Sequence, residues 1–306
     1  MPIVSTSTSA FFERSRRDIK ALRSEAESIQ AQLGRGERLS KSSDDPVAAS
    51  RLRTLMRTDK LSAIDVANAN RANADLTLAD STLSDFSDYI THATELATQA
   101  ASDTLTTDQR ASIGQELQAI HDNLFALANA RDSSGHALFG GESTADAYQL
   151  DAAGNAVYVG TPGAGSLPLG EGQSVTRSIT GPEFLNFTVN GTPTNLMAVV
   201  KNLADALQST ATDPAGAART ALDSLSAGLD SVTTGQTVVG TRLAWIEMTG
   251  DRRVDMGETR SAEEADIGGT DVASAVAKLQ ETMTVLEVSQ ASFGKLASLT
   301  LFDQLR

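Results

Sequence analysis

The chain has 306 residues, of which 40% are hydrophobic and only 4% aromatic, so its cores must be built mainly from Leu, Val, Ile and Ala, as in slender helical bundles. Its formal net charge of -14 disfavours nucleic acids and anionic membranes as partners, because both attract clustered Lys and Arg. The sequence has no cysteine, which excludes disulfides and thiolate metal sites, and no apolar stretch reaches the length of a membrane span.

The first helical pattern has apolar residues in alternating steps of three and four, the spacing of a coiled-coil seam. Its members are Phe12, Ile19, Leu22, Ala26, Ile29 and Leu33. Gly34 and Gly36 then end the pattern. The sequence therefore predicts an N-terminal helix with one narrow apolar seam.

The motif Ser43-Asp44-Asp45-Pro46 predicts the start of a second helix, with Asp45 as its N-cap and Pro46 at its first position. Adjacent aspartates at a helix start are better explained by capping and by the helix dipole than by acid catalysis. The helix is expected to end near Ala100, and its later half again carries a heptad-like seam.

A third helix is expected after the capping-box pattern of Thr106 and Gln109, with its end near Arg131. The sequence pattern then changes. Between Ser133 and Pro193, Gly and Pro residues separate short runs in which apolar and polar residues alternate. These runs include 157–159 and 184–189, and Asn190-Gly191 is a hairpin turn signal. We expect a small β domain, inserted between helices, in which the glycines at 140–141 and 160–165 form turns.

Helical patterns return after this insert. One short helix is expected from Leu196 to Leu207, and a long helix is expected to start at Asp213-Pro214. The pattern is interrupted from Glu263 to Gly269 and then resumes as a last seam. Its members are Val272, Val276, Leu279, Met283, Leu286, Gln290, Phe293 and Ala297. A polar residue within a seam can set the register, but Gln290 is equally consistent with a solvated edge position.

Together these elements predict a mainly α fold with an inserted β domain. We expect an elongated chain in which the N- and C-terminal helices pair as a coiled coil, the inner helices form an antiparallel rod, and the insert forms a β-rich tip. The expected domains are a terminal coiled-coil assembly domain (1–45 with 266–306), a helical rod (46–134 with 194–265) and a β-rich insert (135–193).

Catalytic and metal-binding patterns find little support in the sequence. His92, His121 and His136 lack metal-ligand spacing, and we expect surface or capping roles for them. Ser292 and Lys295 match the serine acyl-enzyme pattern, but the partner motifs are absent. The sequence therefore predicts no enzyme, no cofactor and no metal site.

Three stretches resemble one known family. Gly36-Glu37-Arg38-Leu39 followed by Ser43-Asp44-Asp45-Pro46 is similar to the glycine-basic stretch and helix start of the hook-filament junction proteins of bacterial flagella, which are relatives of flagellin. The stretch with Gly135 and Leu138-Phe139-Gly140-Gly141 resembles a turn of these proteins, although His136 and Ala137 replace its Arg-Tyr pair. The Leu-rich end, 299–305, is similar to the family's closing helix.

This resemblance implies a structural adaptor that assembles as a short ring between a hook-side junction protein and the flagellin filament, with both terminal seams in the assembly. It also implies an extracellular place in the flagellum, unfolded export through the type III channel without a cleaved signal peptide, and an export chaperone that binds the C-terminal segment. The start of the chain is polar Ser and Thr rather than a basic and apolar leader.

Three other functions remain open at this point. The chain could be flagellin itself, although the short insert and the Leu138-Phe139-Gly140-Gly141 turn favour the junction role. A soluble coiled-coil binding protein would have folded ends and no export. A hydrolase would need a convergent polar pocket.

Overall fold

A computed structural model describes residues 3–209 and 213–304, with the side chains of 10–209 and 213–296. The chain divides into two compact units, Met1–Asp59 with Asp255–Arg306, and Lys60–Val254. The described residues are mostly helical and include three two-stranded antiparallel sheets, which confirms the predicted fold class. The three-part domain division stays a prediction.

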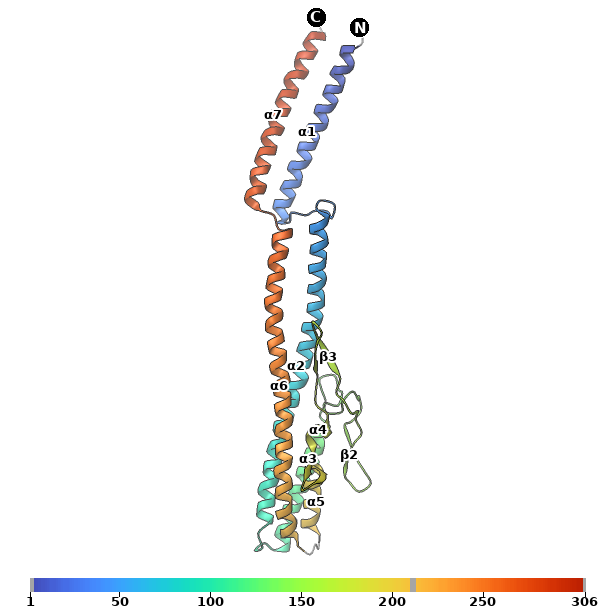
Figure 1. Cartoon of the computed structure of the whole chain (residues 1–306), viewed down its shortest axis with the longest axis vertical. Helices are drawn as coiled ribbons and strands as arrows, with labels where there is room; N and C mark the ends of the chain where they lie inside the picture. The colour runs from blue at the N-terminus through green and yellow to red at the C-terminus, as the bar shows by residue number, and fades with distance from the viewer. Residues whose placement is uncertain (1–2, 210–212, 305–306) are drawn as a thin grey trace. The chain divides into compact units, whose positions relative to one another are not determined.

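The first unit contains the two terminal helices, α1 (Ile3–Arg35) and α7 (Val272–Gln304), which lie side by side (Figure 1). The Phe12 ring meets the Phe293 ring edge-on at a centroid distance of 5.4 Å. The first turns of α2 (Pro46–Ala100) and the last turns of α6 (Pro214–Gly268) belong to the same unit. Arg51 pairs there with Glu263 at 2.5 Å, and Asp59 with Arg260 at 2.7 Å.

The expected interruption from Glu263 to Gly269 is corrected by the structure. Helix α6 continues to Gly268, and the break before α7 falls at residues 269–271. The two connections of this unit, α1 to α2 and α6 to α7, are hydrogen-bonded to each other. The Arg38 N–H donates to the Gly268 carbonyl at 2.8 Å, and the Thr270 N–H donates to the Gly36 carbonyl at 3.0 Å.

In the second unit, helices α2, α3 (Thr107–Ala128), α5 (Leu196–Gln208) and α6 share one hydrophobic core. Its largest fully buried side chains on helices include Leu76, Leu83, Phe86, Ile90, Leu117, Leu124 and Leu196. The backbones of α3 and α5 approach closely at Gly114, where an added Cβ would lie 2.7 Å from the Gln208 side chain.

Local sequence motifs predicted the ends of the helices closely. The Asp45 carboxylate accepts from the Ala48 N–H at 3.0 Å, and α2 begins at Pro46 and ends at Ala100 as predicted. The capping box of Thr106 and Gln109 is formed. Helix α3 ends at Ala128, three residues before the expected end.

The β-rich region consists of three hairpins. They pair β1 (Tyr148–Leu150) with β2 (Ala156–Tyr158), β3 (Ser166–Gly170) with β4 (Gln173–Thr176), and β5 (Asn186–Val189) with β6 (Thr192–Asn195). Asn190 and Gly191 turn the last hairpin with φ of 49° and 78°, as their sequence predicts.

The predicted strand over 184–189 is wrong at its start. Phe184 lies in a short helix, α4 (Gly181–Leu185). The Glu183 carboxylate accepts from the Thr180 N–H at 2.9 Å, and Pro182 occupies the first turn. These residues favour a helix start over a strand.

The β3–β4 hairpin lies along the flank of α2 and α6 within the second unit. Asn68 on α2 donates to the Pro168 carbonyl at 3.1 Å, and Arg253 on α6 donates to the Leu169 carbonyl at 2.5 Å. A two-stranded hairpin is barely stable alone. By lying against the helices it buries Leu169 and Val175.

Candidate assembly site and its supporting loop

The α1 side of the terminal helix pair matches the predicted seam. Ile29 and Ala26 are buried, and the other described members are half-buried against α7. Glu25 on α1 and Lys278 on α7 add an ion pair at 3.2 Å. The periodic apolar residues of α1 therefore form the contact between the two terminal helices.

On α7 the residues that face α1 differ in part from the predicted seam. The half-buried and buried positions follow the line Leu279, Thr282, Leu286, Ser289 and Phe293. Three predicted members, Val272, Val276 and Met283, are 60%, 38% and 51% exposed. Gln290 is also exposed, which corresponds to the solvated edge position, and the side chain of Ala297 lies outside the described residues.

This exposure leaves α7 with apolar surface that the helix pair does not bury. Val285 and Val288 are exposed as well, at 45% and 60%. A helix that is apolar on more than one face has further surface to cover. The α1–α7 pair therefore leaves apolar surface on α7 available for further contacts.

The turn between α1 and α2 is held by its two aspartates, while Ser43 lies exposed beside them. Asp44 accepts hydrogen bonds from the Lys41 N–H and the Ser40 N–H, at 2.8 and 3.1 Å. The bond from the Lys41 N–H is the main reason why the pKa of Asp44 is lowered, and the bond from the Ala48 N–H lowers the pKa of Asp45. Both carboxylates are engaged in fixing backbone, as the capping interpretation predicts.

The loop after α3 carries the second family motif. Gly135, with φ of 83°, lies at its exposed end, whereas Leu138 and Phe139 are buried in the core of the second unit. The Phe139 ring lies 4.9 Å from the Phe184 ring and 6.4 Å from the Phe86 ring, measured between centroids. The motif therefore joins α2, α4 and the loop through one aromatic cluster.

Gly140 and Gly141 come next in the sequence. At both positions the surrounding atoms leave no room for a side chain. A Cβ on Gly140 would lie 2.8 Å from the Ala137 Cβ, and one on Gly141 would overlap the Thr161 side chain. Gly141 also has φ of 72°, in the region that favours glycine. The turn glycines at 140–141 and near 160 pack together, since the Thr161 N–H donates to the Gly140 carbonyl at 3.1 Å.

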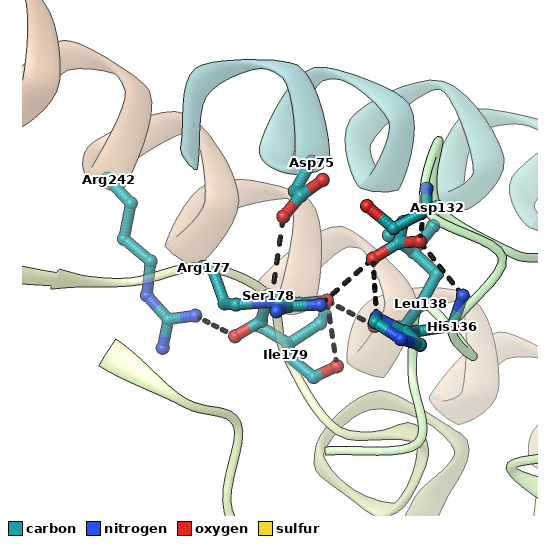
Figure 2. A network of polar contacts seen from close by, with 9 residues as sticks. Asp75, Asp132, His136, Leu138, Arg177, Ser178, Ile179 and Arg242 are labelled. Atoms are coloured by element: carbon teal, nitrogen blue, oxygen red, sulfur yellow. Dashed lines mark hydrogen bonds and ion pairs between the residues drawn. The ribbon is translucent and has the colours of Figure 1, made fainter. Parts of the chain in front are cut away.

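A network of polar contacts ties this loop to α2 and α6 (Figure 2). Arg177 lies between two buried carboxylates, 2.9 Å from Asp132 and 3.5 Å from Asp75 on α2. The second Asp132 oxygen accepts from the N–H groups of Ser134 and His136, at 2.8 and 2.9 Å. These carboxylates are thus occupied in holding the loop.

The network continues to α6 through Ser178. The Ser178 hydroxyl donates to the Leu138 carbonyl at 2.6 Å, and Arg242 donates to the Ser178 carbonyl at 2.6 Å (Figure 2). The segment before α4 is thereby fixed between the motif loop and α6.

Burial of the Asp75 carboxyl disfavours its ionised form. Burial raises the pKa of Asp75, partly opposed by the charge of Arg177. A raised pKa in the folded state gives a stabilisation that is present below the ordinary aspartate value of 3.8 and is lost as the pH rises through the folded value. Asp75 thus favours the folded state more at acid pH than at neutral pH.

We therefore expect the stability difference between the wild type and Asp75→Asn to depend on pH. The melting temperature of the wild type minus that of the variant should be larger near pH 3.8 than at pH 7. Thermal unfolding followed across this range measures it, with Asp80→Asn, at an exposed position of the same helix, as the control. A difference that stays flat or grows with pH would contradict the assignment.

Sequence reasoning missed Asp75, Arg177, Ser178 and Arg242. One signal was available, because Asp75 lies next to Leu76 within the apolar stripe of α2, where a charged residue needs a partner. The partner itself is 102 residues away and no local pattern reveals it. The expectation for His121 was wrong, since it is buried on α3, whereas His92 lies exposed beside Glu116 at 3.0 Å.

Within residues 3–209 and 213–304, none of the helices combines the length and apolar character that a membrane span requires. The described residues include no group of three or more His, Cys, Asp or Glu side chains placed to hold a metal ion. Ser292 and Lys295 both lie on α7, and Ser292 lines the contact with α1.

Comparison with known proteins places these features in a family context. Residues 5–144 match the family model of the bacterial flagellin N-terminal helical region. Flagellar hook-associated protein 3 of Escherichia coli (strain K12) is 26% identical over 313 residues, which cover 97% of this chain and 98% of that protein. The protein of the same name from Salmonella typhimurium (strain LT2) is 32% identical over 138 residues, or 45% of this chain and 44% of that one.

The fold agrees with this similarity. The solved structure of flagellar hook-associated protein-3 from Legionella pneumophila superposes with a TM-score of 0.64 at 14% identity, covering 71% of this chain and 98% of that one. The resemblance predicted from the sequence motifs is confirmed.

Proposed function

We propose that this chain, which is similar to hook-associated protein 3 along 97% of its length, is a structural adaptor of the bacterial flagellum at the junction between hook and filament. That full-length similarity is the observation that carries the proposal, because it includes both terminal helices and the β-rich region together. The role requires no chemistry, only surfaces that assemble.

Assembly takes place through the terminal helices, with copies of the chain forming a ring. The exposed apolar side chains of α7 support this step, since burying one Val or Met contributes about 1.5 to 3 kcal/mol. The predicted seam residues on both helices serve either the α1–α7 contact or the contact between copies. Residues 1–45 with 266–306 act as the assembly domain, 46–134 with 194–265 as the rod, and 135–193 as the insert.

Its partners are a hook-side junction protein and flagellin, and an export chaperone binds the C-terminal segment. The chain reaches the flagellum, outside the cell, unfolded and through the type III channel. No part of this route depends on a cleaved signal peptide.

The test is deletion of the gene in its own host, with the cell surface imaged by electron microscopy. We expect bare hooks and filament protein released into the medium. Intact filaments on the deletion strain would reject the proposal. Loss of filament mass, with the purified chain forming long fibres alone, would instead identify flagellin.

Complementation then tests the exposed face of α7. A plasmid-borne variant with Val272, Val276 and Met283 changed to Ser should fail to restore filaments, because assembly loses apolar burial. A matched variant with Ser at the exposed polar positions Gln280, Thr284 and Glu287 should restore them. Equal rescue by both would exclude this face from assembly.

A further inference from the structure

A groove lies beside the Ser43-Asp44-Asp45-Pro46 turn, wholly within the first unit. Its volume is about 430 Å³, and its walls come from residues 36–39 of the connection between α1 and α2, from the start of α2, and from the end of α6 with Gly269. The lining includes Leu39, Leu52, Met56, Ser261 and Ala265, and the carboxylates of Glu37 and Glu264. Most of these side chains are apolar or small, and Met56 is 55% exposed although it lies at the groove wall.

One polar atom in this groove lacks a partner. Oε1 of Glu264 is buried and accepts no hydrogen bond from the described residues. A carboxylate oxygen withdrawn from water without a donor is costly, so such an atom indicates a missing partner.

Three arginines of the same unit have their hydrogen bonds with other acceptors. Arg51 is bound to Glu263 through two hydrogen bonds, at 2.5 and 2.8 Å. Arg260 is bound to Asp59 at 2.7 Å. Arg38 donates to the Ile267 carbonyl at 2.9 Å and pairs with Asp45 at 3.3 Å. None of these contacts includes Oε1 of Glu264, which has no donor among the described residues.

The chemistry of the groove defines that donor. Apolar walls beside two carboxylates, Glu37 and Glu264, suit a long side chain with an aliphatic stem and a cationic end, as in Lys and Arg. Among the described residues the two carboxylates belong to no group of three or more side chains placed to hold a metal ion, and a divalent cation takes six to eight oxygen ligands. The partner is therefore a basic side chain of a protein.

The chain itself offers such side chains on α1. This helix carries six Lys and Arg against four Asp and Glu, in a protein with a net charge of -14. Arg16, Arg17, Lys20 and Arg23 are exposed. Of these, Arg16 and Lys20 lie four residues apart, hence on neighbouring turns of one face, and neither forms an ion pair with a described residue.

We propose that the groove seats a Lys or Arg side chain from α1 of a second copy of this chain, with the cation at Glu264 and the aliphatic stem along Leu52 and Met56. This inference rests on the proposed self-assembly and names one of its contacts. The basic face of α1 and the groove are different surfaces, so the contact is heterologous and repeats from copy to copy, as a ring requires.

Disulfide trapping tests the contact directly, because the wild-type chain has no cysteine. One full-length variant carries Ser261→Cys at the groove, and the other carries Glu13→Cys on the basic face of α1, which leaves all its cations in place. Mixed under oxidising conditions, they should form a crosslinked heterodimer. The control pairs Ser261→Cys with Gln280→Cys, at an exposed position of α7.

Two further variants test whether formation of the crosslink depends on the negative charge of Glu264. Adding Glu264→Gln to the groove variant should lower the heterodimer yield about tenfold, since the cation loses its counter-charge. Glu258→Gln, at an exposed position of the same helix, should leave the yield unchanged. The melting temperature of the Glu264→Gln monomer should stay within about 2 °C of the wild type, because the monomer loses no contact.

A heterodimer yield equal to that of the Gln280→Cys control would overturn the groove assignment. A yield that Glu264→Gln does not change would overturn it as well. A marked fall in monomer melting temperature would mean that Glu264 is structural, and would overturn it too. Failure of the flagellar role would be separate. Bare hooks in the deletion strain without this crosslink reject the groove alone, whereas a crosslink with normal filaments on deletion cells rejects the adaptor role alone.

Discussion

Replacing Arg177 with methionine is expected to lower the free energy of unfolding of the second unit by about 3 to 5 kcal/mol. The Arg177 side chain is 27% exposed, but its partners Asp75 and Asp132 are 7% and 3% exposed, and both would lose their cation. Methionine preserves much of the side-chain volume. The loss in free energy of unfolding therefore measures the cost of leaving two buried carboxylates without their cation. Trp245 is the only tryptophan and lies in this unit, so its fluorescence during urea unfolding measures the change.

Arg252→Met is the matched control for this prediction. Arg252 pairs with Glu171 at 2.6 Å, but both side chains are well exposed, at 65% and 47%. Exposed pairs contribute up to about 1 kcal/mol, so this variant should unfold close to the wild type. Equal losses in the two variants would show that burial of the network does not matter.

Phe139→Ala is expected to cost about 3 to 5 kcal/mol of the same free energy. The Phe139 ring is fully buried between Phe86 and Phe184, and removing it leaves a cavity that the helices cannot easily close. The same Trp245 fluorescence measures the effect.

Leu150→Ala provides the comparison, because Leu150 lies in the same β-rich region but is 52% exposed. Its substitution should change stability by less than about 1 kcal/mol. If Phe139→Ala were equally mild, the family motif would serve a surface contact rather than the core.

Features set by neighbouring residues were predictable from the sequence. Asp45-Pro46, the pair Thr106 and Gln109, and Asn190-Gly191 each determine their own backbone through hydrogen bonds or allowed φ, and all three predictions are confirmed. The helix at Phe184 carried a similar signal in Thr180 and Glu183, but the aromatic spacing of the segment favoured a strand.

Features set by distant contacts were not predictable. The face of α7 that meets α1 includes Thr282 and Ser289, while Val272 and Met283 stay exposed, because α7 is apolar on several faces and periodicity cannot choose among them. The partners of Asp75 and Glu263 likewise depend on how segments far apart in the sequence meet.

The cross-bonded connections next to Gly36 and Gly269 have a mechanical consequence. A single connecting segment can twist freely, because every residue offers two soft dihedral angles. Here two segments run together and share the Arg38 to Gly268 and Thr270 to Gly36 hydrogen bonds, so neither can rotate without the other. Rotation about the dihedral angles of one segment would break hydrogen bonds to the other, and we therefore expect the two connections to move together.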